Sequence, residues 1–261
     1  PHPAQLTAPI SELLWHQRRT FCGSQVPGPC CGRGAMRGVG LAPGRQQRAD
    51  KDLLRLLSQR RSSEETLLNC LEEDEAGRDP LDDQANSAAH KRDSSGWTPL
   101  HWAAQEGFER LVIRLIELRV GTNDADMCGA TPLMVAAFNG HSSIVEALIE
   151  EVTTDVRKTN HYLGTALHYA AQNGHAEVVQ LLCSARAEID ALDRHCDTPL
   201  SWAARSGHLD AVKKLCELRA DPLVDNNASD DPIELAKAAG HWEVAEVMEA
   251  SVDDPEQLAN S

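Results

Sequence analysis

The chain has 261 residues, of which 41% are hydrophobic but only 4% aromatic, so it is long enough for one or two domains and better suited to thin layers of short helices than to one thick core. Its formal net charge is −15, and because residues 1–48 hold six Arg and one Glu, the remaining body carries −20. This acidic body argues against nucleic acid as a partner, and the lack of any apolar run near the roughly 20 residues that span a bilayer argues against membrane insertion.

Residues 1–49 are predicted to form a disordered leader rich in Pro, Gly and Arg. They show no apolar period, which is typical of disorder. The chain begins at Pro1 rather than Met, so it is either a fragment or a reading frame extended upstream of an initiator at Met36. A third alternative is an organelle transit peptide, because such segments are rich in Arg and poor in acidic residues.

A helical pattern begins near residue 50. Four leucines between residues 53 and 57 form one apolar face, and Ser62 and Glu65 have the spacing of a capping box for a second helix. An acidic loop that contains Pro follows. We therefore predict a divergent N-terminal capping repeat, together with this loop, at 50–92.

From residue 93 the sequence repeats itself with a period of 33 or 34 residues. The five copies are GWTPLHWAAQEGFERLVIRLIEL (96–118), GATPLMVAAFNGHSSIVEALIEE (129–151), GTALHYAAQNGHAEVVQLLCS (164–184), CDTPLSWAARSGHLDAVKKLCEL (196–218) and SDDPIELAKAAGHWEVAEVMEA (229–250). In most copies Thr can cap a first helix, Pro fits its first turn, the Ala pair permits close packing, and Gly ends the helix. A second helix supplies aliphatic residues that one copy alone cannot bury, so we predict stacked copies.

The pattern T-P-L-H-x-A-A followed by G-H at this period resembles the ankyrin repeat. The resemblance covers 93–250 and implies an all-α ankyrin-repeat solenoid of helix-turn-helix repeats with β-hairpin or loop fingers. In the fifth copy, Asp231 replaces Thr and Lys237 replaces the second Ala, which fits a terminal repeat whose outer face meets water. A short acidic tail is predicted at 251–261.

One stretch, HCDTPLSWAARSGH (195–208), holds the residue types from which catalytic and metal sites are built. The repeat explains most of it. His208 follows the turn Gly, as a His does in three other copies, and the resemblance implies that these His residues form hydrogen bonds between adjacent repeats. Ser201 occupies a slot that holds Met134 in the second copy, which no nucleophile would share. We therefore predict no catalytic residue, no metal site and no cofactor.

The resemblance also implies a concave binding face made of fingertips and the exposed side of each first helix. Aromatic residues and Arg dominate interface hot spots, and several occur at these variable positions. The predicted partner-binding residues are Trp97, Gln105, Glu106, Met127, Phe138, Asn139, His161, Tyr162, Gln172, Asn173, Arg194, His195, Asp197 and Arg205. The alternative for the large aromatic groups is that they only cover neighbouring fingers.

The chain departs from the family pattern at two sets of glycines. Arg119, Arg186 and Arg219 stand where the second helix normally ends in Gly. A left-handed backbone there costs a non-Gly residue about 1 kcal/mol, which attraction to the helix dipole offsets in part; the alternative is an arginine row that holds carboxylates or phosphates of a partner. The loop Gly is replaced by Leu163, Cys196 and Ser229, so we expect irregular fingers in copies three to five.

Together these patterns predict a monomeric, non-enzymatic scaffold or adaptor that binds a protein partner. The alternative is the regulatory ankyrin arm of a larger enzyme or channel. An enzyme in its own right would need a closed pocket that buries His195 and Cys196 beside a carboxylate. The eight cysteines lack a framework spacing, so we expect free thiols in a reducing compartment, cytoplasmic or nuclear.

Overall fold

The computed structural model describes residues 53–58, 62–76 and 88–253. The predicted leader, most of the acidic loop and the tail beyond residue 253 lie outside these ranges. Every regular element within them is a helix and none is a strand, which confirms the prediction of an all-α fold. In the described repeats the fingers are therefore loops rather than β-hairpins, and the divisions at residues 49, 92 and 250 stay predictions.

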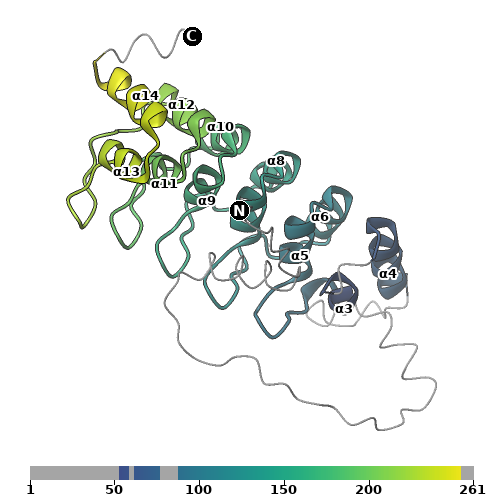
Figure 1. The fold of residues 1–261 in the computed structure, drawn as a ribbon. Coiled ribbons are helices and arrows are strands. Elements are labelled where there is room, and N and C mark those ends of the chain that lie inside the picture. Colours follow the sequence, from purple (N-terminus) through teal and green to yellow (C-terminus); the bar gives the residue numbers. More distant parts are fainter. Residues whose placement is uncertain (1–52, 59–61, 77–87, 254–261) are drawn as a thin grey trace, which may run out of the picture. The chain divides into compact units, whose positions relative to one another are not determined.

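The helices come in pairs that follow one another along the chain. One short 3₁₀ turn, η2 (Ala88–His90), lies between the first and the second pair. The first helices are α3 (Leu53–Ser58), α5 (Pro99–Glu106), α7 (Pro132–Asn139), α9 (Ala166–Gln172), α11 (Pro199–Ser206) and α13 (Pro232–Ala239). The second helices are α4 (Glu64–Ala76), α6 (Glu109–Glu117), α8 (Ser142–Glu150), α10 (Ala176–Ser184), α12 (Leu209–Glu217) and α14 (Trp242–Asp253). First helices pack on first helices and second on second, so the pairs form two layers (Figure 1).

The first helix of each repeat begins and ends as the sequence predicts. Before α5, Thr98 has an extended backbone and Pro99 occupies the first turn. Gly107 ends α5 with a φ of +79°, a left-handed conformation that Gly adopts without steric cost. A Cβ atom at Gly107 would also lie only 2.9 Å from the ring of His141 in the next repeat, so both the backbone and the neighbouring side chain require glycine.

The histidines that follow the turn glycines join adjacent repeats. Nε2 of His141 lies 3.3 Å from the carbonyl oxygen of Gln105, and Nε2 of His175 lies 3.1 Å from that of Phe138. These contacts confirm the inter-repeat hydrogen bonding that the ankyrin resemblance implies. In both cases the imidazole satisfies a carbonyl near the end of the preceding first helix, which has no partner within its own helix.

Small residues of the first layer and aliphatic residues of the second form the core. The Ala pairs of the first four repeats are fully buried, and so are Leu111, Val112 and Leu115 of α6. Burying one such aliphatic side chain stabilises the fold by roughly 1.5–3 kcal/mol. Each of these residues faces a neighbouring repeat or the partner helix, so the stability of any one repeat depends on the repeats beside it.

All five fingers have the same turn, so the expectation of irregular fingers in copies three to five is wrong. Leu163, Cys196 and Ser229 have φ values of 61°, 58° and 65°, in the region that Gly96 and Gly129 occupy. In each finger the N–H of this residue donates to the carbonyl three residues earlier at 3.0 Å. A side chain strains this backbone without changing its conformation, because the hydrogen bonds around the turn are the same in every copy.

The three arginines at the ends of second helices have the left-handed backbone that the family pattern predicts for Gly. Their φ values are 58° at Arg119, 64° at Arg186 and 67° at Arg219. After α6, the N–H of Arg119 donates to Ile116 at 2.8 Å and that of Val120 donates to Leu115 at 3.2 Å. The last carbonyls of the helix are therefore satisfied at the expense of strain at Arg119.

Candidate functional site

The fingers stand beside one another along one edge of the stack and hold each other in place (Figure 1). One backbone hydrogen bond joins each fingertip to the next. These bonds run from Met127 N to Ser95 O (3.1 Å), from His161 N to Cys128 O (3.0 Å), from Arg194 N to Tyr162 O (3.0 Å) and from Asn227 N to His195 O (2.9 Å). We call the fingertips 94–96, 127–129, 161–163, 194–196 and 227–229, together with the adjoining first helices, the finger face. These hydrogen bonds fix the backbone that carries the side chains of the finger face.

Each finger is anchored by an Asp or Asn five residues before the helix cap. In the fourth finger, Oδ1 of Asp193 accepts the N–H groups of His195 and Asp197 at 2.7 and 2.9 Å. The equivalent anchors are Asp93, Asp126, Asn160 and Asn226, and each makes the same pair of bonds. The sequence reasoning missed these residues, although an Asp or Asn at this spacing in all five copies was a signal that could have found them.

The type of anchor, Asp or Asn, also corresponds to the type of aromatic residue on the first helix that follows it. Asp93 and Asp193 each accept the indole N–H of a Trp, Trp102 and Trp202, at 3.2 Å. Where the helix carries Tyr169 instead, the anchor is Asn160, whose amide nitrogen donates to the phenol oxygen at 2.5 Å. Because indole only donates and an amide can also donate, the paired change keeps the contact. These aromatic side chains thus pack each first helix against its own finger.

Two buried histidines tie the helix caps to the next finger. At His168, Nδ1 lies 3.2 Å from the N–H of Thr165, and Nε2 lies 3.1 Å from the carbonyl oxygen of Asp197. His101 has the same arrangement with Thr98 and Ala130. Since Nδ1 accepts and Nε2 donates, both rings are neutral. Burial lowers the pKa of both side chains below the usual value of 6.5.

Three of the predicted partner-binding residues are buried, contrary to the prediction that they face a partner. Trp97 is 9% exposed and its indole N–H donates to Asp126 of the next finger at 3.0 Å. Phe138 is also 9% exposed and lies edge-on to Tyr169. Asp197 is 3% exposed because it sits between its own helix and the next finger. For Trp97 and Phe138 the alternative interpretation holds, since each covers a neighbouring repeat.

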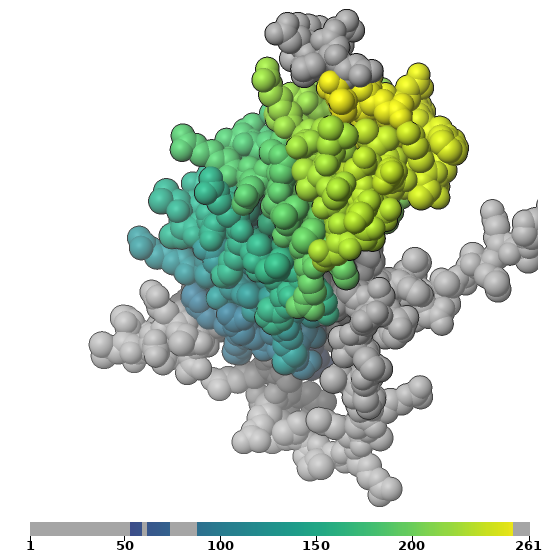
Figure 2. All heavy atoms as spheres, turned by 90° about the vertical axis from the view of Figure 1, so that its left-hand side faces the viewer, coloured from purple at the N-terminus to yellow at the C-terminus, as the bar shows by residue number. Residues whose placement is uncertain are grey.

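The other predicted residues lie on the finger face with differing freedom. Met127, His161, Arg194, His195 and Arg205 are exposed, and Met127 is 70% exposed. Half-buried residues are Gln105, Glu106, Asn139, Tyr162, Gln172 and Asn173. Some are engaged with each other: the amides of Gln105 and Asn139 are hydrogen-bonded, and the guanidinium of Arg194 lies 5.1 Å from the centre of the Tyr162 ring. In Figure 2 the repeats that carry them follow one another in chain order, from blue-teal to green.

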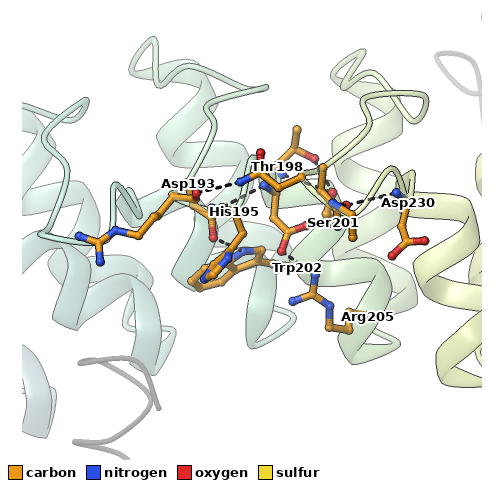
Figure 3. Close-up of polar contacts among 12 residues, drawn as sticks. Asp193, His195, Thr198, Ser201, Trp202, Arg205 and Asp230 are labelled. Atoms are coloured by element: carbon orange, nitrogen blue, oxygen red, sulfur yellow. Dashed lines mark hydrogen bonds and ion pairs between the residues drawn. The ribbon is translucent and has the colours of Figure 1, made fainter. Parts of the chain in front are cut away.

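Four of the predicted residues meet at one pocket between α9 and α11. The pocket has a volume of about 140 Å³ and is lined by Gln172, Asp193, His195, Asp197, Trp202, Arg205 and Ser206. Nη2 of Arg205 lies 2.5 Å from Oδ2 of Asp197, whose other oxygen accepts from Asn226 at 2.9 Å. Figure 3 shows Asp193, His195, Trp202 and Arg205 of this pocket, together with Thr198 and Ser201 at the start of α11 and Asp230 on the next finger.

The pocket does not have the features of a catalytic site. His195 is exposed rather than buried beside a carboxylate, and Ser201 is fully buried with its hydroxyl 3.1 Å from that of Thr198. A larger hollow of about 950 Å³ lies at the ends of α6 and α8, and its lining contains neither His nor Cys. Within the described ranges, no group of three His, Cys, Asp or Glu residues is arranged to hold a metal ion.

Two further predictions concern the thiols and the membrane. Among the described residues, the prediction of free thiols is confirmed at Cys183, Cys196 and Cys216, whereas it is wrong at Cys128, which is disulfide-bonded. No helix in the part of the chain that the structure describes has both the length and the apolar character to cross a membrane.

The comparisons with known proteins agree with the repeat architecture. An E3 ubiquitin-protein ligase of Arabidopsis thaliana, XBAT33, is 36% identical over 97 residues, which are 37% of this chain and 19% of that protein. The ankyrin repeat-containing protein C6C3.08 of Schizosaccharomyces pombe is 35% identical over 95 residues, 35% of this chain and 41% of that protein. The human transient receptor potential cation channel subfamily A member 1 is 33% identical over 113 residues, 41% of this chain and 10% of the channel.

Each of these relatives is therefore matched over less than half of its own length. The sequence profile of ankyrin repeats, in three copies, matches residues 75–160 and 152–230 of this chain. That match covers more than half of the chain and includes the fingers, the capping threonines and the turn glycines of the first four repeats. The chain belongs to the ankyrin-repeat family.

Proposed function

We propose that this chain is a non-catalytic scaffold or adaptor that binds another protein through its finger face. The observation that carries the proposal is the row of exposed side chains on the fingertips and first helices, Met127, His161, Arg194, His195 and Arg205. Ankyrin repeats serve in protein–protein interaction and the family is generally non-catalytic, which supports this choice over an enzyme.

The physical character of the finger face supports binding. The fingertips are joined by backbone hydrogen bonds, so a partner would not have to order them, and the entropy cost of association is smaller. Arg and aromatic groups contribute strongly at interfaces, and an exposed Met adapts to irregular partner surfaces. The finger face combines all three kinds of side chain within neighbouring repeats.

A second candidate function is the regulatory ankyrin arm of a larger enzyme or channel. It is favoured by the relatives that are a ubiquitin-protein ligase and a cation channel, of which the matched segments make up 19% and 10%. In that case the finger face would bind another part of the same polypeptide or its substrate. The full transcript in the source organism distinguishes an independent adaptor from a regulatory arm. A second domain encoded in the same reading frame would support the regulatory arm.

The test is affinity purification from the native source with a finger-face variant, Met127→Ala, Tyr162→Ala, Arg194→Ala and Arg205→Ala combined. The matched control replaces four exposed residues of the second layer, Arg110, Glu146, Glu177 and Lys213, by Ala. We expect partners captured by the unmodified chain to be lost with the first variant and retained with the second. Partners that both variants retain would show that the finger face is not the binding surface.

Two related expectations stay predictions. A monomer is expected because nothing in the repeat pattern calls for a second copy, and light scattering on the purified chain measures its mass directly. A cytoplasmic or nuclear location is expected because the cysteines lack the spacing of a disulfide framework. Cell fractionation with an antibody against the chain tests it.

A further inference from the structure

The pocket between α9 and α11 has the size of a site for one amino-acid side chain. Its volume of about 140 Å³ is well below the roughly 300–1,000 Å³ of pockets that hold small-molecule ligands. Its lining joins His195 of the fourth fingertip to Trp202 and Arg205 of α11, all part of the finger face (Figure 3). A partner segment lying across the fingers would therefore pass its mouth.

The acidic groups at the floor of the pocket have their oxygens occupied by the protein. Asp193 accepts two backbone N–H groups and the indole N–H of Trp202. Asp197 accepts from Arg205 and Asn226. Both carboxylates are buried, so they offer a partner little acceptor surface despite their charge.

The groups at the mouth are hydrogen-bond donors. The side chain of Arg205 is 48% exposed and uses only Nη2 in its ion pair with Asp197, which leaves further guanidinium N–H groups for a partner. His195 and Ser206 are exposed beside it. Gln172 also lines the pocket, with its Oε1 buried and unpaired among the described residues. Rotation of this uncommitted amide about the Cγ–Cδ bond would present its nitrogen as a further donor.

The arrangement occurs in one repeat only. The slot of Arg205 holds Gln105, Phe138, Gln172 and Ala238 in the other copies, and the slot of His195 holds Ser95, Cys128, Tyr162 and Ala228. The fourth repeat alone therefore places two basic side chains at the mouth of a pocket. Since the floor carries the carboxylates of Asp193 and Asp197, an acidic group is favoured only at the mouth, beside Arg205 and His195.

We propose that this pocket binds the carboxylate of an Asp or Glu side chain in a partner segment that lies along the finger face, with Arg205, His195 and Gln172 as donors. The proposal rests on the proposed function, because it assigns one pocket of the same surface. A guanidinium–carboxylate contact is charge-assisted, so it would fix the register of the segment as well as strengthen its binding. A basic side chain is the competing occupant, drawn by Asp193 and Asp197.

The experiment selects random twelve-residue peptides displayed on phage against the full chain. We expect the selected peptides to share one Asp or Glu. Calorimetry should then show that changing this residue to Asn or Gln weakens binding by about ten- to a hundredfold. The same change should have little further effect on the Arg205→Gln variant, because the two changes remove one contact.

Further variants keep the test decisive if Arg205→Gln unfolds the chain by leaving Asp197 unpaired. His195→Ala and Gln172→Ala do not touch that ion pair and should each weaken the acidic peptide severalfold, whereas Arg110→Gln on α6 should not. Selected peptides that carry Lys or Arg instead, or acidic peptides insensitive to all three pocket variants, overturn the carboxylate assignment and leave the proposed function standing. Peptides that also bind the combined finger-face variant unchanged contradict both.

Discussion

The buried histidines show how one side chain can serve two structural roles. His101 and His168 each accept a hydrogen bond from the backbone of the capping Thr and donate one to the next finger. Both bonds require the neutral ring with its proton on Nε2. Protonation of Nδ1 would place an N–H against the N–H of the cap, so the cap and the positive form are incompatible.

These histidines make stability depend on pH. Burial lowers the pKa of His101 and His168 in the folded chain, whereas in the unfolded chain it stays near the ordinary value of about 6.5. As pH falls below about 6.5, the unfolded state therefore binds protons that the folded state does not. The free energy of unfolding should fall between pH 7.5 and 5.5, by at most about 1.4 kcal/mol per pH unit for each residue. Urea denaturation at a series of pH values measures it.

The second repeat supplies the control for this prediction. Met134 occupies the same buried slot without a titratable group. The double variant His101→Met and His168→Met should be less stable at pH 7.5, because it loses hydrogen bonds, but its stability should vary less with pH down to 5.5. An unchanged slope in that variant would show that other groups cause the pH dependence.

At the level of single helices, the ends of the second helices carry strain that the sequence indicated. Arg119, Arg186 and Arg219 have φ values between 58° and 67°, where a side chain costs about 1 kcal/mol relative to Gly. Their side chains are exposed, so attraction to the helix dipole returns about 0.3 kcal/mol, the lower end of its range. The strain therefore exceeds the compensation.

Replacing the three arginines by Gly should raise stability. We expect a gain of about 0.5 kcal/mol at each site, and the gains should add because the sites lie in separate repeats. Urea denaturation measures the change. Lys213→Gly, at an exposed position inside α12, is the matched control and should lose about 1 kcal/mol. A fall in stability of the triple variant would mean that the arginine side chains make stabilising contacts that outweigh the strain.

A side chain of α4, Glu64, caps the N-terminus of α6 and thereby holds α4 to the stack. Oε1 of Glu64 accepts the N–H of Leu111 in the first turn of α6 at 3.0 Å, and Phe108, which precedes α6, provides no side-chain cap. The carboxylate thus satisfies a free N–H group and lies at the positive end of the helix dipole. It connects the divergent first helix pair to the first full repeat.

Loss of this contact should loosen α4. The variant Glu64→Ala should lower the free energy of opening of α3 and α4 by about 1 kcal/mol, which native-state hydrogen exchange of the α4 amides reports. Glu65→Ala changes an exposed neighbour in the same turn and serves as the control. Equal exchange rates in the two variants would contradict a capping role for Glu64.

In the assembled stack, stability and binding surface have the same origin. Each repeat is joined to the next by packed Ala pairs, by the histidines and by the fingertip hydrogen bonds. These contacts are between nearest neighbours, so a change in one repeat is felt mainly by the two beside it. The same contacts place the exposed side chains of Met127, His161, Arg194 and His195 from three fingers in one row, which no single repeat could present.

The repeat period, the capping residues and the turn glycines could be predicted from the sequence because they act within a few residues. Thr98, Gly107 and the left-handed backbone of Arg119 are examples. The regular finger at Cys196 does not follow from the local Gly pattern, because the hydrogen bonds of the Asp193 anchor set the turn even without Gly.

Packing between repeats decided which variable residues are exposed on the finger face. Trp97, Phe138 and Asp197 have the composition of contact residues, but each is covered by the next repeat, at a distance along the chain that a local pattern does not reveal. The pocket that joins Gln172 to His195 and Arg205 likewise arises only when α9 lies beside α11. Local hydrogen bonding and chain stiffness thus determined the repeating frame from the residues themselves, whereas burial between neighbours selected the side chains left free to bind.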